Sequence, residues 1–141
     1  MTKQPKLEYS QIEVGYEFPP ASYKLDPSMV SAYLKAVEET SRLYHDTGLV
    51  PPMAIAAYAM AALSESISLP PGAIHVTQEL EFIDTVSAGD TITCHARVSR
   101  KQNRGRLHLM TVDLDVFNQN QKAVLAGKVG FVLPEPAKDD S

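Results

Sequence analysis

The stretch PMAIAAYAMAALSES, residues 52–66, carries no polar side chain on any face of a helix until its last three positions. A helix that is apolar all round has to be buried on nearly all sides. Its many alanines keep it thin, so a sheet can pack closely around it. Pro51 and Pro52 are tolerated in its first turn, where the amide donors would be unpaired anyway. Residues 52–66 are therefore predicted to form a buried central helix.

Upstream of this stretch, residues 27–43 are predicted to form an amphipathic helix. Asp26 supplies an N-cap, and Pro27 stands at the first helical position. Residues 16–25 have the pattern of an extended segment, whose start Pro19 and Pro20 restrict to a sheet edge or a loop. The apolar residues of the amphipathic helix are spaced three and four apart; they are Met29, Val30, Tyr33, Leu34 and Val37.

Downstream, four segments alternate between apolar and polar residues, as strands with one covered face do. They span residues 75–84, 90–100, 106–117 and 122–133, and short turn sequences rich in Gly, Asn and Asp join the last three. The residues expected on the covered face are Val76, Leu80, Phe82, Ile92, Cys94, Ala96, Val98, Met110, Val112, Leu114, Val116, Ala123, Leu125, Val129, Phe131 and Leu133.

This order of elements predicts one α+β domain over residues 1–141, with a core at about 9–133 and frayed ends. An antiparallel sheet would wrap one long apolar central helix. Such a sheet has open edges, and pairing them with a second copy is a natural way to protect them. We therefore expect a dimer.

The composition is that of an ordinary globular domain, with 44% hydrophobic and 21% charged residues in 141. The formal net charge of −4 argues against a nucleic-acid-binding surface, which needs a clustered basic face. The first residues lack the apolar segment of a secretory signal. The longest near-apolar run, residues 48–63, is too short to cross a bilayer. We expect no membrane association and a cytoplasmic location.

One basic cluster allows two interpretations. It is either a solvated hairpin end or a landing site for the phosphates of a carrier such as coenzyme A. The members of the basic cluster are Arg97, Arg100, Lys101, Arg104 and Arg106.

The single cysteine, Cys94, excludes an internal disulfide and is expected in the core, which fits a reducing compartment.

Together these features resemble the MaoC-like hotdog domains, which include (R)-specific enoyl hydratases and (3R)-hydroxyacyl dehydratases. The resemblance covers roughly residues 9–133. It implies a hotdog fold, a homodimer or a heterodimer with another hotdog subunit, and an acyl thioester on coenzyme A or a carrier protein as ligand. The segments that carry it are Tyr9-Ser-Gln-Ile-Glu-Val-Gly-Tyr-Glu17, Ala36-Val-Glu-Glu39, Gly48-Leu-Val-Pro-Pro-Met53, Glu79-Leu-Glu-Phe82 and Ser87-Ala-Gly-Asp-Thr-Ile92.

Catalytic members of that family carry Asp and His in a motif of the form G-D-x-N-P-x-H. Here Glu39 takes the Asp place and Tyr44 the His place, with His45 one residue further on. The family's His-Gly pair at the head of the central helix, whose backbone amide holds the thioester carbonyl, appears as Pro51-Pro52, and Pro52 has no N–H to donate. Non-catalytic subunits of some two-subunit dehydratases show a similar loss.

The resemblance implies Glu39, Tyr44 and His45 as catalytic residues. Glu39 would be a general base, although a solvated residue at a helix end has the same pattern, as does Glu38. Tyr44 would be a weak acid or a structural ring, and His45 is the group best matched to proton transfer near neutral pH. The residues expected to bind substrate, with the helix from Met53 as the floor of an acyl tunnel, are Pro52, Met53, Ala54 and Tyr58.

Other polar residues have simpler interpretations. Glu65 is either a thioesterase-type carboxylate or the polar end of the central helix. His75, His95 and His108 belong to strand patterns on or near the solvent side. No metal-ligand spacing, no cofactor motif and no G-x-S-x-G nucleophile motif is recognised. Three hypotheses remain: a hydratase or dehydratase of acyl thioesters or a subunit of one, a non-catalytic acyl-binding partner, and an acyl-CoA thioesterase.

Overall fold

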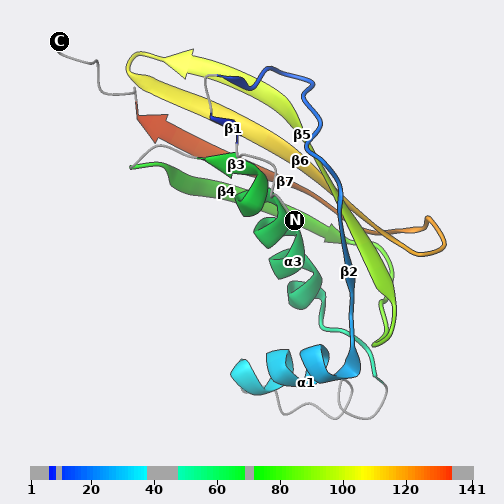
Figure 1. Cartoon of the computed structure of the whole chain (residues 1–141). Helices are drawn as coiled ribbons and strands as arrows, with labels where there is room; N and C mark the ends of the chain where they lie inside the picture. The colour runs from blue at the N-terminus through cyan, green and yellow to red at the C-terminus, as the bar shows by residue number, and fades with distance from the viewer. Residues whose placement is uncertain (1–6, 9–10, 38–47, 69–71, 135–141) are drawn as a thin grey trace.

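The computed structural model describes residues 7–8, 11–37, 48–68 and 72–134. Its main sheet is antiparallel, with the strand order β2-β5-β6-β7-β4 (Figure 1). A small second sheet pairs β1 (Leu7–Glu8) in parallel with β3 (Ile67–Ser68). The strands of the main sheet are β2 (Ala21–Lys24), β4 (Ile74–Phe82), β5 (Thr91–Arg104), β6 (Leu107–Asn118) and β7 (Ala123–Pro134).

The strand predictions are confirmed. Each of the four alternating segments forms one strand, and its ends differ from the prediction by only a few residues. The largest difference is at β5, which continues to Arg104 and so lengthens the hairpin with β6. The inward faces of β5, β6 and β7 form the core as the alternation predicts, with Ile92, Val112 and Val129 fully buried.

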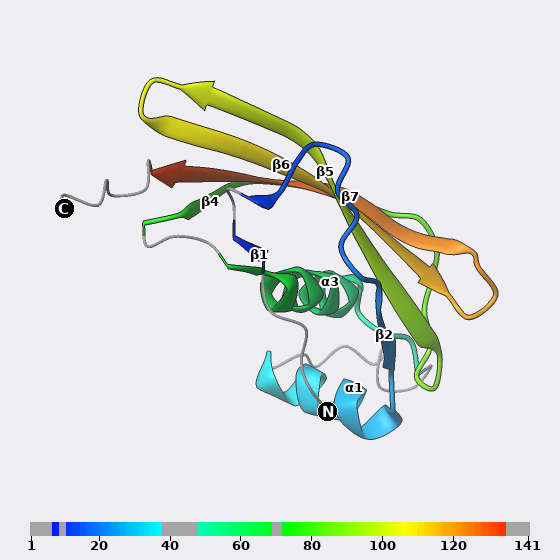
Figure 2. The same cartoon turned by 45° about the horizontal axis from the view of Figure 1, so that its top comes forward.

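The described chain has two helices, α1 (Pro27–Ala36) and α3 (Pro52–Ser66), so the expected single long central helix is not confirmed. The bounds of α3 are those predicted, and α3 lies between the main sheet and α1 (Figures 1 and 2). The prediction that α1 runs to residue 43 is wrong, because α1 ends at Ala36 and Val37 caps it. Acidic Glu38 and Glu39 follow, and negative charge is unfavourable at a helix C-terminus.

The prediction that α3 is buried on nearly all sides is wrong for this chain. The helix buries one face, which carries Ala54, Ile55, Ala56, Ala59 and Leu63. On its other side Met53 is 53% exposed, and Ala57 and Ala61 are exposed too. The reason is geometric, because one sheet can cover only one side of a helix. An apolar outward side of α3 is therefore left open within the chain.

Strand β4 lies at the edge of the main sheet, and its apolar residues are less buried than predicted. Val76 is 50% exposed and Phe82 is 42% exposed, while Leu80 is half-buried. The pairing of β4 with β7 also shifts register between His75 and Thr77, as at a β-bulge. The edge position explains the exposure, because no further strand pairs with β4 in the described residues.

Neither described helix is long and apolar enough to cross a membrane.

Candidate functional site

The start of α3 is held against the loop that precedes β5. The Val50 amide donates to the Val86 carbonyl (2.7 Å), and the Ala88 amide donates to the Gly48 carbonyl (2.7 Å). The same loop holds the end of β2, because the Gly89 amide donates to the Leu25 carbonyl (2.6 Å). Gly89 has a φ of 96°, a left-handed conformation that suits glycine. One turn thus positions the starts of both helices.

The first turn of α3 has an unusual set of backbone donors. Pro51, the N-cap, and Pro52 have no N–H, and the Ala54 amide donates to the Pro51 carbonyl (2.9 Å). Met53 therefore carries the first N–H of the helix. The first amides of an α-helix have no partner within the helix and point toward its positive end. The Met53 amide is the group at this position that can hold a ligand oxygen.

The four predicted substrate-binding residues differ in their surroundings. Pro52 is half-buried, and Met53 is 53% exposed at the mouth of the helix. Ala54 is only 3% exposed and faces the core, so its side chain packs against the domain interior. Tyr58 is half-buried and lies one turn beyond Ala54, between the buried face and the exposed side of α3.

Tyr58 meets an aromatic ring that the sequence analysis did not single out. Tyr23 of β2 lies with its ring centroid 5.0 Å from that of Tyr58, and the two rings are tilted by 39°. Burial, and then the nearby Asp26 carboxylate, raise the pKa of Tyr58 above its usual 10.0. Burial, and then Glu65, also raise the pKa of Tyr23. Both phenols therefore stay protonated at neutral pH and can donate hydrogen bonds.

A small cavity lies between α3 and the sheet. The cavity there has a volume of about 10 Å³, which is room for one water at most. It is lined on the helix side by Ala59, Ala62 and Leu63, and on the sheet side by Cys94 and Leu114. This cavity is too small to hold an acyl chain.

Cys94 is a core residue, as predicted. Its side chain is buried, and burial raises the pKa of the thiol from 9.0 to about 11. The thiolate is the reactive form of cysteine, so Cys94 is a poor nucleophile at neutral pH.

The histidines of the strands take part in local contacts. His95 is exposed and meets the ring of Phe117 edge-on at 5.4 Å. His75 is exposed and packs on Phe131 at 5.3 Å, and His108 contacts the side-chain oxygen of Asn103. The described residues hold no group of three or more His, Cys, Asp or Glu side chains that could bind a metal ion.

The predicted catalytic residues Glu39, Tyr44 and His45, and also Glu38, lie outside the described residues. Glu65 is exposed at the end of α3, two turns beyond Tyr58.

The basic cluster does not act as one group. Arg97 approaches Asp113 at 3.6 Å, and the Lys101 ammonium donates to the Ile12 carbonyl (2.6 Å). Arg100, Arg104 and Arg106 are exposed around the end of the β5–β6 hairpin. A phosphate site on this hairpin would depend on these three arginines.

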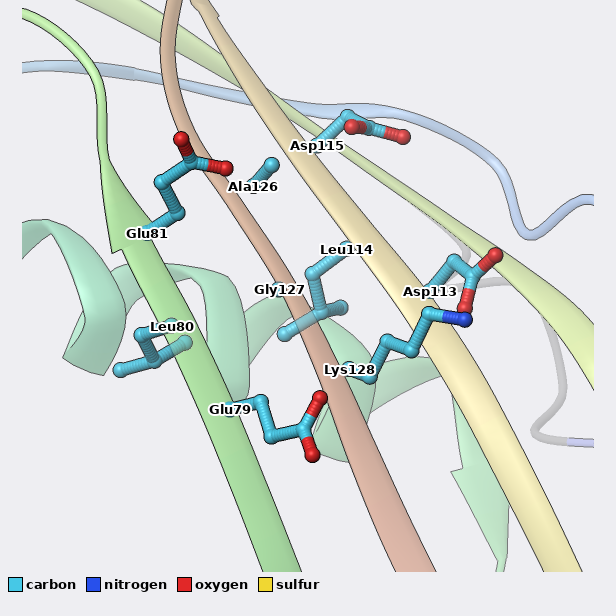
Figure 3. Close-up of a pocket in the computed structure, with 9 residues that line it drawn as sticks. All are labelled: Glu79, Leu80, Glu81, Asp113, Leu114, Asp115, Ala126, Gly127 and Lys128. Atoms are coloured by element: carbon cyan, nitrogen blue, oxygen red, sulfur yellow. The ribbon is translucent and has the colours of Figure 1, made fainter.

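A separate hollow of about 340 Å³ lies on the outer face of the sheet, which is the face opposite α3 (Figure 3). Its polar lining comes from alternate residues of three neighbouring strands. Because α3 lies on the other side of the sheet, this hollow is not part of the predicted acyl site. Its charged side chains are Glu79, Glu81, Asp113, Asp115 and Lys128.

Tyr23 is the residue of this region that sequence reasoning missed. It lies in a short edge strand, where alternation over four residues carries little information, and its partner is in another element. An aromatic residue in an otherwise small and polar segment was the only available signal.

The comparisons with known proteins agree with this architecture. Residues 13–126 match the family described as "FAS1-like, dehydratase domain region". No curated protein matches the sequence.

Three solved structures are similar in fold. The monoamine oxidase regulatory protein of Archaeoglobus superposes with a TM-score of 0.80 at 16% identity, over 96% of this chain and 99% of that one. The unliganded R-hydratase PhaJ1 of Pseudomonas aeruginosa gives 0.77 at 21% identity, over 90% and 85%. The ChsH1–ChsH2 complex of Mycobacterium tuberculosis gives 0.71 at 18% identity, over 86% and 98%. At these identities the likeness shows the hotdog fold.

Proposed function

We propose, from the premise that this chain belongs to the FAS1-like dehydratase domain family, that it is a hydratase or dehydratase of acyl thioesters or a subunit of one. The reaction would add water to a 2-enoyl thioester or remove it from a 3-hydroxyacyl thioester.

The observation that carries this proposal is the start of α3. The helix presents its first free amide, that of Met53, beside an apolar outward side that continues through Ala57 and Ala61. A thioester carbonyl at the helix start would receive a hydrogen bond and the positive end of the helix dipole, both of which stabilise an enolate oxygen. The acyl chain would then follow the apolar side of the helix.

We assign the proton transfers to the segment between the helices. Glu39 would remove the proton beside the carbonyl, and His45 or Tyr44 would handle water at the third carbon. The segment ends at Gly48, whose carbonyl is bound by the loop before β5, so it leads directly to the start of α3. The protonated phenols of Tyr23 and Tyr58 would donate hydrogen bonds to a polar group of the ligand.

The test is an activity assay of the purified chain with trans-2-enoyl-CoA and 3-hydroxyacyl-CoA esters of several lengths. Enoyl absorbance and free thiol are read in the same wells. Reversible change of enoyl absorbance without thiol supports the proposal. Release of thiol contradicts it and identifies a thioesterase.

A second function is favoured by one specific observation, the Pro51-Pro52 pair. Replacement of the usual donor by proline weakens the oxyanion site, and this suits a non-catalytic subunit that completes the acyl site of a catalytic hotdog partner. If the purified chain changes neither the enoyl absorbance nor the amount of free thiol, this result supports the second function. Full hydratase activity of the chain alone contradicts it.

In either case we propose assembly with another hotdog subunit. The support is the open edge of β4 and the open side of α3, which leave Met53 and Phe82 more than two-fifths exposed. Burial of such residues is a main source of stability in permanent protein interfaces.

A further inference from the structure

The edge strand β4 provides an inference about the partner that rests on the proposed hotdog assembly. Among the described residues β4 pairs with β7 alone, so the backbone groups along its other side are open. An exposed edge of nine residues is a template for another strand, and proteins usually cover or disguise it. The exposed apolar side chains on or next to this edge are Ile74, Val76, Phe82 and Ile83.

The outer face of the same strand is acidic. Glu79 and Glu81 are both exposed and point to the side of the sheet that also carries Asp113 and Asp115 (Figure 3). Lys128 is the cation of this hollow. On the outer face of the sheet, the carboxylates of this hollow therefore outnumber its cation, and two of them lie on the open edge strand β4.

Asp113 has a second cation nearby, from the neighbouring strand β5. Its Oδ2 is 3.6 Å from Arg97, while its Oδ1 is buried and has no hydrogen-bond partner among the described residues. Arg97 therefore offsets part of the negative charge of this face.

The geometry of β4 restricts how two copies could pair. Two hotdog sheets joined edge to edge must keep their apolar faces on one side, and alternate residues of a strand face opposite sides. A symmetric pairing therefore has its axis at a residue and not between two. The regular part of β4 after the bulge runs from Thr77 to Phe82. A pairing centred on this part has its axis at Glu79 or Leu80.

Both positions of the axis place like charges directly opposite each other. With the axis at Leu80, Glu79 of each copy faces Glu81 of the other, and with the axis at Glu79 the two copies of that residue face each other. Like charges directly opposite on neighbouring strands are destabilising. Asp113 and Asp115 lie on β6, two strands in from β4, so Glu79 and Glu81 are the carboxylates that meet across the axis.

We propose that β4 pairs with the edge strand of a different hotdog chain, whose outward side chains opposite Glu79 and Glu81 are Lys or Arg. The acidic edge selects against a second copy of this chain and for a cationic partner strand. Selection of this kind, by repulsion of the wrong partner and attraction of the right one, is a common source of specificity. It explains why the same strand exposes both apolar residues and two carboxylates.

The experiment uses the charge-reversed variant E79K/E81K as a surrogate for the cationic strand. Wild type and variant are each purified, mixed in equal amounts at low ionic strength, and measured by native mass spectrometry and sedimentation velocity. We expect wild type alone to be mainly monomeric. The mixture should contain more mixed dimer than random pairing of the two proteins would give. The milder variant E79Q/E81Q should self-associate roughly fivefold to tenfold more tightly than wild type. High salt should reduce both differences.

The matched control is E13K/E17K, which makes the same charge change on exposed residues near the opposite edge of the sheet. It should associate with wild type no more than wild type does with itself. The proposal is overturned if wild type alone is a dimer as tight as E79Q/E81Q, or if mixing yields no excess of mixed dimer. Because no substrate is present, a failure here leaves the activity assay of the proposed function unaffected, and the reverse also holds.

Discussion

Tyr23 of β2 and Tyr58 of α3 lie with their rings 5.0 Å apart, and this contact joins the edge strand to the outward side of the helix. Aromatic pairs at this separation contribute about 0.5–1.5 kcal/mol beyond the area that they bury. The pair therefore helps to hold α3 in place and supplies the phenols next to the proposed acyl path.

Tyr58→Ala should destabilise the domain by about 2–3 kcal/mol, because it removes both the buried ring surface and the aromatic pair. Tyr58→Phe retains the ring and should cost less than about 1 kcal/mol. Urea unfolding followed by circular dichroism measures both values. Equal stability of Tyr58→Ala and wild type would show that the ring contact does not support the helix.

The stability of the domain should fall at alkaline pH through Cys94. The thiol pKa is raised from 9.0 to about 11 by burial, so the folded state holds its proton more tightly than the unfolded state does. The stabilisation is fully present below about pH 9 and is lost as the pH rises toward 11. Two pKa units correspond to roughly 2–3 kcal/mol.

Urea unfolding at pH 7 and pH 10.5 tests this loss, with Cys94→Ala as the control. The variant lacks the thiol and should lose about 1–2 kcal/mol less than wild type between the two pH values. The raised pKa values of Tyr23 and Tyr58 act in the same direction above about pH 10 in both proteins. Parallel losses in the two proteins would contradict the assignment to Cys94.

Two glycines of β7 should differ in how their replacement can be rescued. A Cβ at Gly127 would lie 2.7 Å from the backbone carbonyl oxygen of Glu79, whereas a Cβ at Gly130 would meet the Thr77 hydroxyl. Gly127→Ala should therefore cost about 1–3 kcal/mol, because a backbone must move.

Gly130→Ala should recover most of its loss when combined with Thr77→Ala, which removes the obstructing side chain. Gly127→Ala combined with Leu80→Ala should recover little, because the clash with the Glu79 carbonyl remains. Urea midpoints of the four proteins give the comparison. Full recovery in the Leu80 combination would mean that the backbone contact is not limiting.

If the chain is active alone, Glu39→Gln and His45→Ala should each lower kcat/KM for enoyl-thioester hydration by about 100-fold or more. Glu38→Gln is the control, since Glu38 is the neighbouring carboxylate and is not assigned a proton transfer. Activity like that of wild type in both variants would reject the two assignments.

Pro52→Ala restores a backbone N–H at the head of α3. In an active chain the added donor should raise kcat/KM by about 10-fold or more, on the scale of one oxyanion-site amide. Pro51→Ala, which changes the residue before the helix, is the control. An unchanged or lower rate in a folded Pro52→Ala protein would show that this amide is not directed at the thioester oxygen.

The sequence predicted both described helices, the four long strands and most of the core. It missed the short strands β1 and β3, because Leu7–Glu8 was expected to be part of a frayed end. Residues 52–66 formed α3 with the bounds expected, and the alternation in residues 90–133 gave the inward faces of β5, β6 and β7 correctly. These features depend on the period of a helix or a strand, which is visible over a few neighbouring residues. The family resemblance also rested on local motifs and was confirmed by the match over residues 13–126.

The tertiary structure alone decided which apolar surfaces are covered and which distant residues meet. Sequence apolarity could not distinguish burial within the chain from exposure at an edge, as the 53% exposure of Met53 and the 50% exposure of Val76 show. The strand order alone placed β4 at the edge and brought Glu79 and Asp113 to one hollow, and it set Tyr23 against Tyr58. Such contacts depend on how elements far apart in the chain are arranged, and no local periodicity encodes that arrangement.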